Sequence, residues 1–111
     1  MSDICTLRCY FPHGARLNAE GFWKKLRSQP LGLYLIKEAK RADIQQALLI
    51  SAHAGYLAGH PLRYRHPEYV SIQHPDCVEL IDSKPRLKAF AEQHREQLHD
   101  AQIMMFSGEP I

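Results

Sequence analysis

The pattern of hydrophobic and polar residues predicts four main strands along this chain of 111 residues. Residues 5–11 alternate with period two, so Cys5, Leu7 and Cys9 should share one buried face of a strand. Further strands are predicted at residues 46–52, 77–81 and 101–106, with Pro75 breaking the chain before the third of these. Residues 68–72 indicate a short additional returning strand.

Two segments have the periodicity of helices that bury one side. The first covers residues 31–42, with Pro30 in its first turn and Ser28 or Gln29 near the cap position. Its apolar stripe consists of Leu31, Leu35, Ile36, Ala39 and Ala42. The second helix follows Ser83 as its N-cap, with Pro85 in the first turn. Its inward face consists of Leu87, Phe90, Ala91, His94 and Leu98.

The resulting order β-α-β-β-α-β predicts a ferredoxin-like α+β fold with two helices on one face of a four-stranded antiparallel sheet. We expect a single domain over residues 1–111, because this length matches one ordinary domain. A long connecting segment, residues 12–30, contains a short helical stretch at 22–27, and residues 107–111 form a loose tail. The last strand is apolar on both sides, so we expect the uncovered sheet face to be buried by oligomerisation.

Composition narrows the class of protein. Hydrophobic residues make up 45% and charged residues 23% of the chain, which is typical of a soluble globular domain. The formal net charge of +2 does not favour a nucleic-acid binder. The polar N-terminus and the lack of a long apolar run predict a cytoplasmic protein. Three cysteines, an odd number, indicate free thiols, and Cys5 and Cys9 are expected to be core residues.

A basic loop follows the second predicted strand. Residues 53–66 contain three histidines and two arginines, and no acidic residue occurs between Asp43 and Glu68. Arg63, Arg65 and His66 could bind a phosphate group or an acidic partner surface, since guanidinium groups bind phosphate oxygens in pairs. Gly55 and Gly59 would let the backbone of the loop approach a ligand. The loop, taken as residues 53–67, is therefore the predicted site for an effector or a partner.

Two other functional classes stay open on the residues alone. A metal could be bound by His53, His60 and His66, with His74 as a further candidate, although their spacings of seven, six and eight match no compact motif. A small dimeric α+β barrel enzyme shares this element order. Tyr10, Trp23 and His74 could supply its pocket between sheet and helices. Recognition of RNA is not favoured, because the predicted sheet lacks exposed aromatic residues on its central strands.

Residues 30–56, PLGLYLIKEAKRADIQQALLISAHAGY, resemble the helix-strand-loop core of a PII-like family long carried as a domain of unknown function. The shared features are Pro-Leu opening the helix, Ala-Asp-Ile before the strand, and Gly55-Tyr56 after it. The run CVELIDS at residues 77–83 and the later Phe90 resemble the second half of the family. The resemblance covers about residues 7–106, with Ser51-Ala52 at a position where the family has Arg-Gly and Leu57 where Gly is usual.

The resemblance implies a homotrimer similar to the nitrogen-regulatory PII proteins and the CutA proteins, with the sheets packed inward. It implies a non-catalytic regulator that binds a small anionic effector, an adenine nucleotide among the candidates, in clefts between subunits. It also implies that the 53–67 loop, in the position of the PII signalling loop, contacts a membrane transporter or an enzyme. Gly55, Arg63, Arg65 and His66 are the residues expected to make these contacts. A CutA-like metal-binding role is the alternative.

Overall fold

The computed structural model describes residues 3–16 and 29–111, and it confirms the predicted order of long elements. The elements are β1 (Ile4–Pro12), α2 (Leu31–Arg41), β2 (Gln46–Ser51), β3 (Ala54–Gly55), β4 (Arg63–Tyr64), β5 (Pro75–Ser83), α3 (Lys84–Gln93) and β6 (Gln102–Ser107). The helical stretch expected at residues 22–27 lies outside the described residues.

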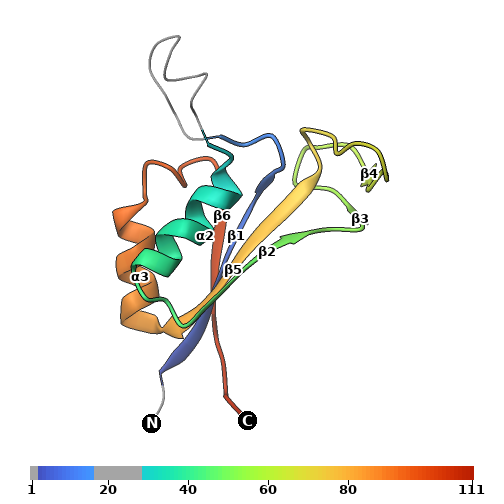
Figure 1. Ribbon diagram of the computed structural model, residues 1–111. Coiled ribbons are helices and arrows are strands. Elements are labelled where there is room, and N and C mark those ends of the chain that lie inside the picture. Colours follow the sequence, from blue (N-terminus) through green and yellow to red (C-terminus); the bar gives the residue numbers. More distant parts are fainter. Residues whose placement is uncertain (1–2, 17–28) are drawn as a thin grey trace.

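Four antiparallel strands form one sheet in the order β2-β5-β1-β6. Both helices lie on the same face of this sheet, and the segment carrying β3 and β4 projects beyond one end of it (Figure 1). The central pair β1 and β5 is in register over nine residues, from Ile4 opposite Ser83 to Pro12 opposite Pro75. The architecture is the ferredoxin-like α+β fold that the element order predicted.

The core lies between the helices and the sheet. Leu7 and Leu80 face each other on the central ladder and are at most 1% exposed. Leu35 of α2 and Leu87 of α3 are completely buried in the same cluster. The strict alternation along β1 selects these residues, because successive side chains point to opposite faces of a strand. Cys5 and Cys9 belong to this core as predicted, and burial raises the pKa of the Cys9 thiol to about 12.

The opposite face of the sheet is covered by no element that the structure describes. Its edge strands present Leu48, Ile50, Met104 and Phe106, which are 42–46% exposed. At its centre the guanidinium of Arg8 donates a 3.0 Å hydrogen bond to Glu79 and lies 5.4 Å from the Phe106 ring centroid. We call this surface, built from alternate residues of β1, β2, β5 and β6, the bare face.

Several local expectations were wrong. Residues 68–72 contain no strand, since they consist of a bend at residue 68, irregular backbone at 69–71 and the start of a turn at 72. Pro75 does not break the chain but begins β5, a position where its missing N–H removes no ladder hydrogen bond. Ala42 is exposed beyond the end of α2, where Asp43 has a φ of 56° that turns the chain away from the helix. At the start of α2, Pro30 itself is the cap residue, with no side-chain cap bond.

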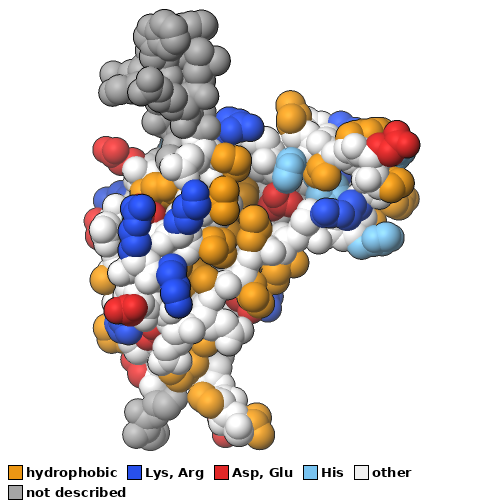
Figure 2. Space-filling model, viewed as in Figure 1, with side chains coloured by type: hydrophobic (Ala, Val, Ile, Leu, Met, Phe, Trp, Pro, Cys, Tyr) orange, Lys and Arg blue, Asp and Glu red, His pale blue; other side chains and the backbone are white. Residues whose placement is uncertain are grey.

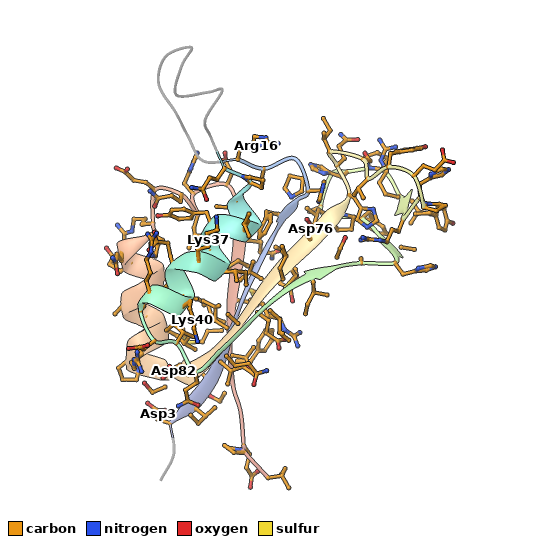
Figure 3. All side chains as sticks on the ribbon, in the orientation of Figure 1. Asp3, Arg16, Lys37, Lys40, Asp76 and Asp82 are labelled. Atoms are coloured by element: carbon orange, nitrogen blue, oxygen red, sulfur yellow. The ribbon has the colours of Figure 1, made fainter. Side chains whose placement is uncertain are left out.

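Asp82 joins three segments at the end of the sheet remote from the projecting loop, as Figure 3 shows. Its carboxylate accepts hydrogen bonds from the backbone N–H of Ser83 at 2.6 Å and of Gln45 at 2.9 Å. The guanidinium of Arg86 lies 3.4 Å from the same group. The Asp82 side chain is 2% exposed, so these contacts replace the hydrogen bonds that water would otherwise donate to the carboxylate. Asp82 therefore fixes the start of α3 and the turn before β2.

We predict that Asp82→Ala lowers the free energy of unfolding by about 3 kcal/mol, because it leaves two backbone donors without their acceptor in a buried place. Urea unfolding of both proteins measures the difference. Asp100→Ala is the matched control, since that side chain is 89% exposed and its loss should change stability by less than about 0.5 kcal/mol. Equal stabilities of the two variants would contradict this role for Asp82.

His94 packs between the two helices. Its ring lies 4.5 Å from the Phe90 ring centroid and edge-on to Tyr34, whose hydroxyl is 3.0 Å from Nδ1. Burial lowers the pKa of His94, with an opposing effect from Glu38, and burial raises the pKa of Tyr34. The neutral imidazole can therefore accept a hydrogen bond from the Tyr34 hydroxyl at Nδ1, and the inward position predicted for His94 is confirmed.

The lowered pKa of His94 makes stability depend on pH. Above the pKa of this histidine in the unfolded chain, about 6.5, His94 is neutral in both states, so its titration does not change the free energy of unfolding. Below it the unfolded chain takes up a proton that the folded chain resists, so stability falls as the pH falls. We predict that His94→Gln loses less stability than the wild type when the pH falls from about 7.5 to about 5.5. The amide oxygen of glutamine can accept a hydrogen bond from the Tyr34 hydroxyl, and the amide does not titrate. Parallel losses in urea unfolding would refute the prediction.

Candidate functional site

The projecting loop, residues 52–74, leaves the sheet at the end of β2 and returns at the start of β5. Its two ends are fastened to each other. The Ala52 N–H donates to the Pro75 carbonyl at 3.2 Å, and Nε2 of His74 donates to the Ala52 carbonyl at 2.5 Å. His74 is fully buried, so this second bond is shielded from water. The base of the loop is thus a fixed part of the fold.

Within the loop, β3 and β4 form a small hairpin that the sequence pattern did not reveal, since two-residue strands are too short to show alternation. Ala54 pairs with Tyr64 and Gly55 with Arg63. The Arg65 N–H continues the ladder by donating to the His53 carbonyl at 2.8 Å. The hairpin gives the loop a defined shape, with a base at the sheet and a tip facing away from it (Figure 1).

A pocket of about 250 Å³ lies where the loop meets the bare face. Its walls come from the sheet and from the outgoing strand of the loop: Tyr10, Ile50, Ala52, Gly55, Tyr56, Leu57, Pro75, Asp76 and Cys77. The walls are mainly apolar, and a Cβ added to Gly55 would lie 3.5 Å from Pro75. Burial raises the pKa of Cys77, so its sulfur is a neutral thiol and a poor nucleophile at neutral pH. The pocket is therefore better suited to binding a flat apolar group than to catalysing a reaction.

A second, open hollow of about 430 Å³ lies at the tip of the loop. It is lined by His53, Arg65, His66, Pro67, Glu68, Tyr69 and Val70. The rings of His66 and Tyr69 stack with centroids 4.3 Å apart, and Nδ1 of His66 accepts a hydrogen bond from the Glu68 N–H. We call this surface the basic hollow. Figure 2 shows hydrophobic, basic and histidine side chains intermixed over the projecting loop.

The residues predicted to form one site are therefore divided between two places. Gly55 lines the pocket at the loop base, whereas Arg65 and His66 line the basic hollow. Arg63 lies between them on β4, where its guanidinium donates to the Gln73 side chain at 2.6 Å. Arg63 is half-buried, so its first role is to join β4 to the segment that leads into β5.

The histidines do not converge. No group of three or more His, Cys, Asp or Glu side chains that could hold a metal occurs within residues 3–16 and 29–111. His53 and His66 line the basic hollow, His60 is half-buried in a turn, and His74 is committed to the loop base. Of the residues considered for an enzyme pocket, Tyr10 lines the pocket, His74 does not, and Trp23 lies outside the described residues.

The sequence pattern did not reveal a side-chain hydrogen bond between His13 and Asp76 beside the loop base. Nδ1 of His13 lies 2.8 Å from an Asp76 carboxylate oxygen, and the Asp76 side chain is 7% exposed. Figure 3 shows Asp76 at the end of β5 next to the loop. The preceding strand pattern could have identified Asp76, because an acidic residue two positions before Val78 must share the buried face of β5.

Enclosed polar atoms without hydrogen-bond partners also mark this region. Among the described residues they are Ser51 Oγ, His60 Nδ1, Arg63 Nε, His74 Nδ1 and Asp76 Oδ1, and all belong to the loop or to the strand ends that carry it. Such atoms are costly in an ordinary interior, so their concentration favours a binding region. A larger groove of about 760 Å³, between α3 and β6, contains none of them.

No helix among the described residues has the length and apolar character needed to cross a membrane. Comparison with curated proteins finds no match. Solved structures show that the fold is known. CPII from Thiomonas intermedia K12, solved with ADP and bicarbonate, aligns with a TM-score of 0.57 at 8% identity over 93% of this chain and 83% of that one.

Two further structures share the fold. The divalent ion tolerance protein CutA1 from Ehrlichia chaffeensis aligns with a TM-score of 0.53 at 11% identity, over 100% of this chain and 86% of the other. A candidate PII-like signaling protein from Thermus thermophilus aligns with a TM-score of 0.51 at 14% identity, over 97% of this chain and 89% of the other. At these identities the likeness shows the fold alone, and it agrees with the predicted PII-like and CutA-like architecture.

The sequence also matches a family model, described as DUF190, Uncharacterized ACR, over residues 21–108. The match spans α2, α3 and the strands β2 to β6, which supply the basic hollow and every residue of the pocket except Tyr10. This chain belongs to the DUF190 family and has the fold of PII-like proteins.

Proposed function

We propose that this protein is a non-catalytic, PII-like regulator that binds a small anionic effector with a flat ring system, an adenine nucleotide first among the candidates. The observation that carries the proposal is the apolar pocket of about 250 Å³ between the loop base and the sheet. Apolar pockets with a few polar groups at the rim are usual small-ligand sites. The structural relative CPII was solved with ADP and bicarbonate, which supports testing this nucleotide here.

Assembly would complete this site. Tyr10, Ile50 and Cys77 line the pocket and also belong to the bare face. Tyr10 and Cys77 alternate with the buried residues of β1 and β5, and Ile50 pairs with Cys77. The bare face exposes several large apolar side chains around one ion pair, a composition that favours packing against copies of the chain. A homotrimer packed through these faces would place the pocket in a cleft between neighbouring subunits, close to groups of the next chain.

The loop supplies the second part of the function. It projects beyond the sheet, so the basic hollow at its tip stays accessible when the bare faces are packed together (Figure 1). Arg65 and His66 can donate hydrogen bonds to carboxylates or phosphates. A transporter or an enzyme with an acidic surface is the partner class that this chemistry would recognise.

We expect titration calorimetry of the wild-type protein to show heat with ADP, ATP or AMP, with bicarbonate as a second additive. Gly55→Leu should weaken this binding by at least about tenfold, because the new side chain occupies the pocket beside Pro75. Ala58→Leu is the control, since residue 58 is exposed in the loop and outside the pocket. Equal binding by both variants would place the nucleotide elsewhere, and no heat with any nucleotide would overturn the effector assignment.

A mass measurement in solution tests the assembly. We expect a particle of three 12.8 kDa chains, and we expect Met104→Asp to dissociate it because a charge would be buried in the interface. Leu33→Asp is a closely matched control, since both side chains are 43% exposed but Leu33 lies on the solvent side of α2. A wild-type monomer, or dissociation of both variants alike, would contradict packing through the bare face.

A further inference from the structure

We propose that the hairpin of β3 and β4 docks on the surface of a membrane that contains anionic lipid. The proposal goes beyond the function proposed above, because Leu62 and Tyr64, which carry it, line neither the pocket nor the basic hollow. The hairpin would lie on the lipid headgroups without crossing the membrane.

The two faces of the hairpin differ in exposure. Gly55 and Arg63, which pair across it, are half-buried, whereas Ala54 and Tyr64, the neighbouring pair, are exposed. Successive side chains of a strand point to opposite faces, so one face is turned toward the body of the protein and the other toward solvent. Arg63 anchors the inner face through its 2.6 Å hydrogen bond to Gln73.

Three large side chains lie on the solvent side. Continued by one pair, the register of the ladder places Tyr56 opposite Leu62, on the same side as Tyr64. These residues are 69%, 54% and 71% exposed, respectively. The turn that joins the two strands is closed by the His60 N–H, which donates to the Leu57 carbonyl at 2.9 Å. We call the surface of Tyr56, Leu62 and Tyr64 the outer face of the hairpin.

The charge around the outer face is complementary to an anionic surface. No acidic residue occurs between Asp43 and Glu68, so the hairpin itself contributes no carboxylate. Arg65 and His53, which flank the two strands of the hairpin, are exposed. Anionic headgroups attract exposed cationic side chains, and no carboxylate of the hairpin opposes that attraction.

The side chains of the outer face favour lipid over a protein groove. Tyrosine combines an apolar ring with a hydroxyl that stays hydrated, and it is enriched where membranes meet water. All three side chains are more than half exposed, on a loop that projects beyond the sheet (Figure 1). Protruding side chains enter a lipid surface without a matching pocket, whereas a protein partner must supply a complementary surface for each of them.

Cosedimentation of the full chain with vesicles tests the proposal. The probes are vesicles of phosphatidylcholine with about one quarter phosphatidylglycerol, and vesicles of phosphatidylcholine alone. We expect the wild type to bind the anionic vesicles at least about tenfold more strongly, and to lose most of this binding between about 0.05 M and about 0.5 M NaCl. Leu62→Ser and Tyr64→Ser should each weaken binding at least about threefold, because less apolar area enters the lipid, whereas Tyr64→Trp should preserve it.

Leu33→Ser is the matched control for Leu62→Ser, since Leu33 is a 43% exposed leucine on the solvent side of α2 and its loss should not change binding. Thermal melts verify that these surface variants are folded. A wild type that does not bind the anionic vesicles would overturn the proposal. Equal binding by the wild type, Leu62→Ser and Tyr64→Ser would also overturn it, because charge alone would then account for the attraction.

Soluble polyglutamate represents an acidic protein surface. We expect its binding to be insensitive to Leu62→Ser and Tyr64→Ser, because it offers no apolar layer for these side chains to enter. If both variants weaken polyglutamate binding as much as vesicle binding, the outer face recognises an acidic protein and the lipid assignment is wrong. Neither result changes the proposed effector site, which lies in the pocket.

Discussion

The register of the β1–β5 ladder is the constraint on which the rest of the structure depends. Nine consecutive pairs determine which side chains reach the helices and which reach the bare face. A slip of one residue would exchange the two sets, moving Leu7 and Leu80 outward and the ion pair of Arg8 and Glu79 into the core. The same register directs Cys77 to the bare face and Asp76 to the helix face, and both line the pocket where the loop meets the sheet, so the ladder also builds the candidate site.

The loop carries chemistry that the scaffold alone does not need. The core between helices and sheet consists of apolar residues that alternate along the strands. The described side chains with buried polar atoms that lack a hydrogen-bond partner lie instead in the loop and at the strand ends that carry it. An interior selected only for stability would avoid them, because each costs free energy unless it is hydrogen-bonded. Asp82, at the other end of β5, differs from these residues. Its carboxylate accepts hydrogen bonds from two backbone N–H groups and lies beside the Arg86 guanidinium.

Most of the fold followed from the sequence because helices and strands of this length carry a measurable period. Residues 5–11 and the buried positions Leu87 and Phe90 of α3 were identified in this way. The helix is shorter than predicted, because it ends at Gln93, so His94 and Leu98 are buried from the turns that follow it. The loop could not be predicted in the same detail. The hairpin of Ala54 and Tyr64 is too short for a pattern, and the pairing of His13 with Asp76 joins residues far apart in the chain. Gly55, Arg65 and His66 were found as residues, but their division between two cavities depends on tertiary structure.

The fastening of the loop to the sheet has a consequence for how such proteins can diversify. Most of the bonds that hold the loop ends use backbone groups, which every amino acid supplies, and His74 contributes the one side-chain bond at the Ala52 carbonyl. Residues at the tip can therefore be replaced during evolution with little effect on the folding of the chain. Relatives could keep one pocket and acquire different partners, because recognition at the tip and the integrity of the scaffold are encoded by separate positions.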